Sequence, residues 1–127
     1  MTYKILIVDD SKLARMAVGK VLSGLRPQWE RIEATNADEA LALARQSKFH
    51  IALLDFNMPG RDGLDLAAEL RQMSPDMPVA VISANMQHEI VTRAHQIGAY
   101  FLPKPLTPEA MTAFVSQAEQ RLGATGQ

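Results

Sequence analysis

The 127-residue chain contains no cysteine, few aromatic residues (6%) and no excess of charge of either sign. Without cysteine it has no disulfide, no thiolate zinc site and no cysteine nucleophile, which is consistent with a reducing compartment. The 13 Lys and Arg and 14 Asp and Glu residues give a net charge of −1, so the basic field typical of nucleic-acid-binding proteins is absent. No apolar run approaches the roughly 20 residues of a membrane span, and no signal peptide is evident. The composition predicts one globular, cytoplasmic domain with no direct nucleic-acid or membrane binding.

The sequence does contain five short apolar runs, each followed by a stretch with helical spacing. The runs are Ile5–Val8, Ile32–Thr35, Ile51–Leu54, Val79–Ile82 and Tyr100–Leu102. Four of them are nearly continuous in apolar residues, as expected of strands that are buried on both faces. The residues 31–34 instead alternate charged with apolar side chains, which is typical of a strand at the edge of a sheet.

The stretches between the runs carry helix caps and apolar stripes. Ser11, Asn36 and Thr107 are placed to cap helices, Asn36 with Glu39 in the form of a capping box, and Gly98 is placed to end one. The predicted buried positions, helix by helix, are Leu13, Ala17, Val21 and Leu25; Ala40, Leu41 and Ala44; Leu66, Leu70 and Met73; Ile90, Val91, Ala94 and Ile97; and Met111, Phe114, Val115, Ala118 and Leu122. The domain is expected to occupy residues 1–123 and a loose tail residues 124–127.

This alternation of strands and helices with short connections predicts an α/β fold with a parallel sheet covered on both faces. Five strands are too few for an eightfold barrel. We therefore expect a doubly wound, flavodoxin-like (βα)5 sheet with the strand order 2-1-3-4-5. The functional site of such a sheet lies at the carboxyl ends of its strands.

Polar residues follow four of the five predicted strands: Asp9 and Asp10 the first, Asp55 the third, Ser83 the fourth and Lys104 the fifth. Three carboxylates at one edge repel one another unless a cation lies among them, and a hard ion such as Mg²⁺ prefers oxygen ligands. A nucleophilic carboxylate beside a metal, a lysine and a hydroxyl, without an evident general base, indicates phosphoryl transfer onto an aspartate.

Four motifs, in this order and at strand ends, resemble the response-regulator receiver (CheY-like) family over essentially the whole chain. They are Ile5–Ser11, Leu53–Gly60 with Asp62-Gly63, Val81–Ala84 and Lys104-Pro105. Any one of them alone is weak, whereas the four together form a highly specific signature. The resemblance implies a signalling module of two-component systems.

The resemblance also implies roles for individual residues. Asp55 would be the phosphoacceptor and Asp10 a direct ligand of Mg²⁺, for which Mn²⁺ could substitute. Asp9 would hold a metal-bound water, and Asn57 would offer its backbone carbonyl to the ion. No enzymatic activity is expected beyond self-phosphorylation and autodephosphorylation at Asp55.

The implied switch residues follow the last two strands or lie within them. Ser83 would hydrogen-bond the phosphoryl oxygen, although a plain helix-capping role is its alternative, and Lys104 would pair with the phosphoryl group. The peptide from Lys104 to Pro105 is expected to be cis. Phe101 occupies the switch position where the family often has tyrosine, so its ring can swing inward but cannot hydrogen-bond.

The expected phosphoryl donor is a sensor histidine kinase or a histidine phosphotransfer protein. The expected output surface comprises the last two helices and the strand between them, and phosphorylation-linked homodimerisation stays open. Because no output domain follows the receiver, we expect either a partner contacted in trans or an excerpt from a longer protein.

Three alternatives differ in function class. A flavin-binding redox protein could share the topology, but Asp9 and Asp10 would repel the flavin phosphate at the first loop. A receiver-shaped binding module without phosphorylation predicts the loss of an acidic or lysine position, and none is lost. A haloacid-dehalogenase-type phosphatase would need a second aspartate after the nucleophile, where Phe56 and Asn57 stand. Outside the site, Trp29 is predicted to be a packing anchor and His50 a loop residue.

Overall fold

The computed structural model describes residues 2–125 and confirms the α/β architecture. The strands are β1 (Lys4–Val8), β2 (Glu30–Ala34), β3 (Ile51–Asp55), β4 (Val79–Ser83) and β5 (Tyr100–Pro103). The helices are α1 (Lys12–Leu25), α2 (Ala37–Gln46), α3 (Gly63–Met73), α4 (His88–Gln96) and α5 (Pro108–Thr125). All strand pairs are parallel, and the sheet order is β2-β1-β3-β4-β5, as predicted.

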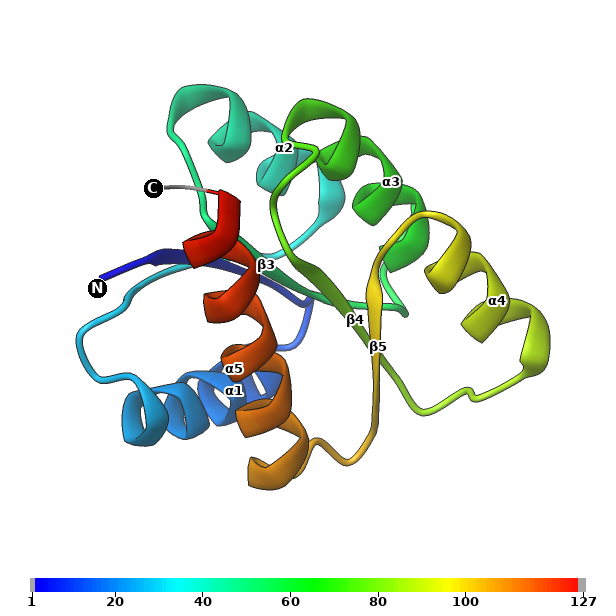
Figure 1. The fold of residues 1–127 in the computed structure, drawn as a ribbon. Helices are drawn as coiled ribbons and strands as arrows, with labels where there is room; N and C mark the ends of the chain where they lie inside the picture. Colours follow the sequence, from blue (N-terminus) through cyan, green and yellow to red (C-terminus); the bar gives the residue numbers. More distant parts are fainter. Residues whose placement is uncertain (1, 126–127) are drawn as a thin grey trace.

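Helices cover both faces of the sheet, with α1 and α5 on one side and α2, α3 and α4 on the other (Figure 1). Successive residues of β1 therefore enter different cores: Leu6 and Val8 pack on the α2–α4 side, and Ile5 and Ile7 on the α1–α5 side. Because side chains alternate across a strand, a central strand in this position must be apolar throughout. This requirement explains the continuous apolar runs of β1, β3 and β4.

The two edge strands are those with the less regular sequences. β2 lies at one edge, as its charged and apolar alternation predicts, although it begins at Glu30 and ends at Ala34, earlier than expected. β5 lies at the other edge and includes Pro103, which pairs with Ser83 of β4. A proline is accommodated there because an edge strand does not need every backbone N–H for pairing.

Helix caps form at the predicted positions. The Ser11 hydroxyl accepts a hydrogen bond from Ala14 N, and Asn36 Oδ1 accepts one from Glu39 N at 2.8 Å. The Glu39 carboxylate returns to the backbone N–H of Thr35, one residue before the cap, and so closes the capping box in a shifted form. Gly98 follows α4 with a φ of 74°, the left-handed conformation that favours glycine.

The predicted buried stripe of α1 is right for two of its four residues. Val21 and Leu25 are half-buried and pack against the core, but Leu13 is 78% exposed and Ala17 is also exposed. The helix is rotated so that Val18 and Leu22 form its fully buried face. Apolar residues extend around more than half of this helix, so their spacing alone does not select the face that docks on the sheet. In α3, Leu66 and Leu70 are buried as expected, but Met73 is 40% exposed in the last turn.

The last helix follows the prediction closely. Met111, Phe114, Val115 and Ala118 are buried against the sheet, and the Thr107 hydroxyl accepts a hydrogen bond from Ala110 N. The helix continues through Thr125, so residues 124 and 125 are helical where the sequence predicts a tail. Residues 126 and 127 lie outside the described residues. Within residues 2–125, no helix is long and apolar enough to cross a membrane.

Candidate functional site

Asp55 is the last residue of β3, the central strand, and the residue is only 4% exposed. An apolar strand buried on both faces delivers this carboxylate to the edge where ligands bind in doubly wound sheets. The chain then turns back on itself, with Gly63 N donating to Phe56 O at 2.9 Å. A Cβ at Gly63 would collide with the main chain of Asp55 and Phe56, so this position requires glycine.

The Asp62-Gly63 motif thus has a structural basis that the sequence prediction did not assign. Asp62 is the N-cap of α3, and its Oδ1 accepts a hydrogen bond from Asp65 N at 2.8 Å. Gly63 allows this helix to begin directly against the backbone of Asp55. The pair together fixes the loop that leaves the central strand.

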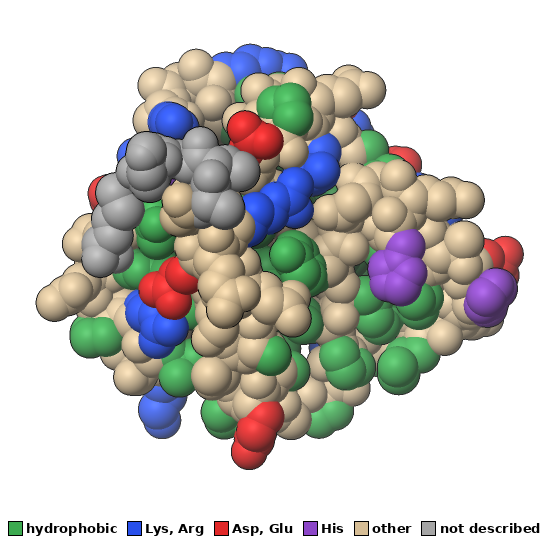
Figure 2. Space-filling view, viewed as in Figure 1, with side chains coloured by type: hydrophobic (Ala, Val, Ile, Leu, Met, Phe, Trp, Pro, Cys, Tyr) green, Lys and Arg blue, Asp and Glu red, His purple; other side chains and the backbone are tan. Residues whose placement is uncertain are grey.

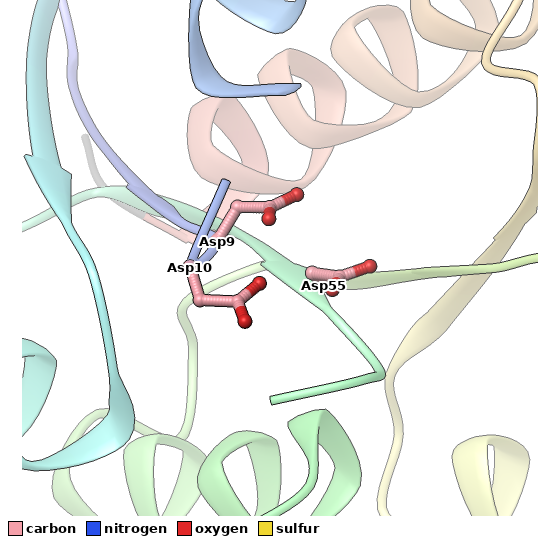
Figure 3. Close-up of side chains that lie close together, drawn as sticks. All are labelled: Asp9, Asp10 and Asp55. Atoms are coloured by element: carbon pink, nitrogen blue, oxygen red, sulfur yellow. The ribbon is translucent and has the colours of Figure 1, made fainter. Parts of the chain in front are cut away.

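Asp9 and Asp10 follow β1, the neighbour of β3 in the sheet. Asp9 is 8% exposed, its N–H donates to Ala34 O, and its Oδ1 accepts from Ser11 N at 2.9 Å. Asp10 is exposed. One carboxylate oxygen each from Asp9, Asp10 and Asp55 lies within 4.8 Å of the others, and Figure 3 shows the three side chains gathered at the ends of β1 and β3.

This crowding affects the protonation of Asp9. Burial raises the pKa of its carboxyl above 3.8, and the negative charges of Asp55 and Asp10 raise it further. The hydrogen bond from Ser11 and the charge of Lys104 lower it, but the net shift is upward. The folded protein therefore holds negative charge at this edge at an energetic cost that a cation would relieve.

Lys104 supplies one cation to the edge. Its Nζ lies 2.6 Å from Asp55 Oδ1, and the backbone N–H of Lys104 donates to Ser83 O. Within the described part of the chain, Asp55 Oδ1 accepts no hydrogen bond of regular geometry, so the ammonium group is its direct counter-charge. The peptide between Lys104 and Pro105 is cis, as the sequence predicts.

Ser83 and Phe101 lie on the strands beside the carboxylates. Ser83 is fully buried, and its hydroxyl accepts from Asn85 N at 2.9 Å and donates to Asn85 O at 3.3 Å. This local turn is a third arrangement, neither a helix cap nor a contact to Asp55, and the sequence prediction did not assign Asn85. Phe101 is half-buried in β5 and packs against the core on the α2–α4 side. Asn57 is exposed in the loop after Asp55.

The donor set fits a hard divalent cation. Three carboxylates within reach of one ion offer only oxygen, which suits Mg²⁺, Mn²⁺ or Ca²⁺ and not a metal that prefers thiolate or imidazole. Three carboxyl groups share this edge with one ammonium group, that of Lys104, which contacts Asp55. The acidic cluster is therefore a candidate metal centre.

A groove of about 560 Å³ opens beside the cluster, between α1 and the loop that follows β5. Asp9 and Lys104 line it, and the remaining lining residues are apolar: Ala14, Ala17, Val18, Val21, Ile82, Ala84, Pro105 and Leu106. A mostly apolar surface therefore lies next to the acidic cluster.

Comparison with known proteins settles the family. Residues 5–116 match the model of the response regulator receiver domain. This chain belongs to that family. The match confirms the resemblance recognised from the four motifs, and it argues against the flavin-binding and dehalogenase-type alternatives. A receiver domain is a signalling module and not a classical enzyme.

Curated relatives of this receiver domain include longer regulators. The chain is 38% identical over 117 residues to the "Glycerol metabolism activator" of Pseudomonas putida and covers 53% of its length. It is 36% identical to the "Positive alginate biosynthesis regulatory protein" of Pseudomonas aeruginosa, covering 47%, and 32% identical to the "DNA-binding transcriptional regulator NtrC" of Salmonella typhimurium, covering 24%. These alignments span 91%, 91% and 88% of this chain. The receiver domain thus spans about half the length, or less, of these relatives.

Solved structures agree on the fold. The chemotaxis protein CheY4 of Vibrio cholerae superposes with a TM-score of 0.83 at 27% identity, over 93% of this chain and 99% of that one. A CheY-like receiver domain protein from Methanospirillum hungatei gives a TM-score of 0.87 at 22% identity, over 98% and 99% of the two chains. This second likeness shows the fold alone.

Proposed function

We propose that this receiver domain accepts a phosphoryl group on Asp55 from a phosphohistidine of a sensor histidine kinase or a histidine phosphotransfer protein. The observation that carries the proposal is the buried carboxylate at the end of the central strand, in contact with Lys104 and close to two further carboxylates. The proposal includes a cytoplasmic location, as the family resemblance implies.

In the proposed reaction, a carboxylate oxygen of Asp55 attacks phosphorus as the P–N bond of phosphohistidine breaks. The donor imidazole leaves with the bonding electron pair and takes up a proton from solvent, and an acyl phosphate remains on the receiver. Asp10, Asp55 and the backbone carbonyl of Asn57 would hold Mg²⁺ or Mn²⁺, with Asp9 holding a water of the ion. When bound, such an ion would supply positive charge to offset that of the phosphoryl oxygens.

Three further residues of the domain would change their contacts on phosphorylation. Lys104, now paired with Asp55 at 2.6 Å, would transfer its ammonium contact to a phosphoryl oxygen. Ser83 would exchange its hydrogen bond to Asn85 O for one to the phosphoryl group, which would release the turn before α4. The half-buried ring of Phe101 would then swing inward. Dephosphorylation by water at the same site completes the cycle.

The output surface in this proposal is α4–β5–α5, the region of the chain that follows Ser83. Figure 2 shows this face, where apolar, acidic and basic side chains are interspersed and histidine side chains lie over α4. A mixed surface of this kind suits a reversible protein partner, and homodimerisation on phosphorylation is one form that the partner could take. About the downstream target, we propose only that it is a protein and that it binds through this face.

The decisive test is intact-mass spectrometry after incubation with a small phosphodonor such as acetyl phosphate and Mg²⁺. Wild type should gain the mass of one phosphoryl group, and Asp55→Asn should gain none. Asp38→Asn removes an equal charge from an exposed position in the first turn of α2 and should label like wild type. Equal labelling of wild type and Asp55→Asn would overturn the proposal.

A further inference from the structure

Arg15 in the first turns of α1 is an arginine with a largely buried side chain, 11% exposed. Its Nη1–H donates to the backbone carbonyl of Asp9 at 2.7 Å, and its Nε–H donates to Glu33 Oε1 at 2.8 Å. Glu33 lies on β2, opposite Ile7 of β1, so Arg15 is held between the helix, the edge strand and the loop that carries the acidic residues. Burying an arginine in this way requires partners of good geometry, and the two short contacts provide them.

The carbonyl that accepts the hydrogen bond from Arg15 belongs to the peptide that joins Asp9 to Asp10. A peptide unit is planar, so fixing its carbonyl oxygen also fixes the nitrogen and Cα of Asp10. The N–H of Asp9 is held by Ala34 O, and its carboxylate by Ser11 N. These three anchors leave the backbone on the Asp9 side with little freedom.

Asp10 is the member of the acidic cluster that lacks such anchors of its own. Within residues 2–125, its carboxylate takes part in no hydrogen bond or ion pair, and the residue is exposed. Its position within 4.8 Å of the Asp9 and Asp55 oxygens therefore depends on where the backbone places its Cα. That backbone is the peptide that Arg15 holds.

We propose that Arg15 is a positioning residue that fixes the Asp9–Asp10 peptide and thereby sets the affinity of the acidic cluster for a divalent cation. The inference rests on the proposed function, because it takes the cluster to be the Mg²⁺ site. It assigns Arg15 no contact with the ion or with the phosphoryl group. Mutation of the residues that hold metal ligands in place commonly lowers the affinity for the metal by about 10- to 100-fold.

The sign of the effect separates this role from simple electrostatics. Arg15 is a cation close to a cation site, so removing its charge should tighten Mg²⁺ binding if charge alone mattered. Removing its hydrogen bond to the Asp9 carbonyl should weaken Mg²⁺ binding if Arg15 acts by positioning Asp10. Arg15→Met, which keeps the apolar stem and loses both donors, therefore distinguishes the two effects by direction.

Arg26 offers a matched control at the other end of α1. It also donates to a backbone carbonyl, Leu25 O at 2.8 Å, and to a carboxylate, Glu119 Oε1 at 2.7 Å. Arg26→Met removes the same charge and the same two types of contact, away from the acidic cluster. It should lower the stability of the fold and leave Mg²⁺ binding unchanged.

The experiment titrates MgCl₂ into wild type, Arg15→Met, Arg15→Lys and Arg26→Met and follows backbone amides by ¹H–¹⁵N NMR, without any phosphodonor. We expect about a tenfold higher Kd for Arg15→Met than for wild type. Arg15→Lys should fall between them, because an ammonium can reach the Asp9 carbonyl or Glu33 but not span both as a fork. This second variant carries the test if Arg15→Met does not fold.

Two results would overturn the inference while leaving the proposed function intact: a Kd for the Arg15 variants equal to or lower than that of wild type, or an equal rise for Arg26→Met. No Mg²⁺ binding by wild type would overturn the inference and the metal site of the proposed function together. Weaker binding confined to the Arg15 variants supports the positioning role.

Discussion

The two ends of the sheet are built on opposite principles. At the amino ends, Tyr3 and Trp29 are buried with their rings edge-on at 5.6 Å, and Tyr3 also contacts the His50 ring. His50 Nδ1 accepts a hydrogen bond from Lys4 N at 3.0 Å, and His50 N donates to Lys4 O. At the carboxyl ends, three carboxylates crowd within 4.8 Å. The amino end is built from packed aromatic rings and hydrogen bonds, whereas the carboxyl end gathers carboxylates that repel one another.

Burial disfavours charge at both ends, but it shifts the two pKa values in opposite directions. The pKa of His50 is lowered below 6.5, mainly by burial and then by the charges of Lys48 and Lys4. The pKa of the Asp9 carboxyl is raised, also mainly by burial. Burial therefore favours the neutral imidazole of His50, which accepts a hydrogen bond from Lys4 N, and disfavours the ionised carboxylate of Asp9. The comparison indicates that the amino end is arranged for stability, whereas the carboxyl end carries the candidate site at a cost in stability.

The largest expected effect comes from breaking the amino end. Trp29→Ala removes a side chain that is 4% exposed, and we expect a loss of about 3–5 kcal/mol in the free energy of unfolding. Urea denaturation followed by circular dichroism measures it, with Trp29→Phe as the control that retains an aromatic ring beside Tyr3 and should lose less. Where Trp29→Ala remains folded, its Mg²⁺ affinity should match wild type; weakened binding would show that the two ends are coupled.

An intermediate effect is expected at the carboxyl end. Mg²⁺ binds only the folded arrangement, so at ten times its Kd it should stabilise wild type by about 1.4 kcal/mol. Asp10→Asn removes one repelling charge while keeping the shape, and should therefore raise the stability of the metal-free protein and lose most of the Mg²⁺ effect. Thermal unfolding of both proteins with EDTA and with millimolar Mg²⁺ provides the measurement.

For this second comparison, a core substitution such as Val115→Ala is the control, because it should lower stability equally with and without the ion. A wild type without any Mg²⁺ shift, or an Asp10→Asn variant that keeps the full shift, would show that the three aspartates are not the metal site.

The smallest expected effect is the pH dependence of stability that His50 contributes at the amino end of the sheet. The folded-state pKa of His50 lies below its unfolded value of 6.5, so the unfolded chain takes up the proton first. Its contribution to stability is present above pH 6.5 and is lost as the pH falls through the folded-state pKa. The loss should amount to about 1 kcal/mol at most, the net value of one neutral hydrogen bond.

The measurement compares urea unfolding of wild type and His50→Gln above pH 6.5 and well below it. Acidification should destabilise wild type more than the variant, because glutamine does not titrate there. The exposed His88 and His95, and Asp9, are common to both proteins, so their contributions cancel in the difference. An identical pH dependence of the two proteins would contradict a role for the His50 contact.

Much of the candidate site was predictable because strand ends are local features. An apolar run that stops at Asp9 or Asp55 places a carboxylate at the end of a strand whatever the rest of the chain does. The parallel topology then brings these ends to one edge. The cis peptide at Pro105 was foreseen by resemblance to the family and is present.

Other features depended on the folded shape of the loops at the strand ends or, for Arg15, on a contact with a distant strand. The turn between Ser83 and Asn85, and the collision that excludes any side chain at Gly63, follow from how the loops close over the ends of β3 and β4. The sequence shows Arg15 as one of three basic residues in this helix, but it names neither Asp9 nor Glu33 as its partner.

Local sequence is enough to predict the order of strands and helices, the caps at Ser11, Asn36 and Thr107, and the positions of the acidic residues, because each depends on a few neighbouring residues. The rotation of α1, in contrast, depends on packing between elements. With apolar side chains around much of its circumference, the helix could bury more than one face, and packing against the sheet and α5 selected Val18 and Leu22. That rotation leaves Leu13 in solvent and turns Arg15 toward the backbone of Asp9, since residues of a helix move together when it docks.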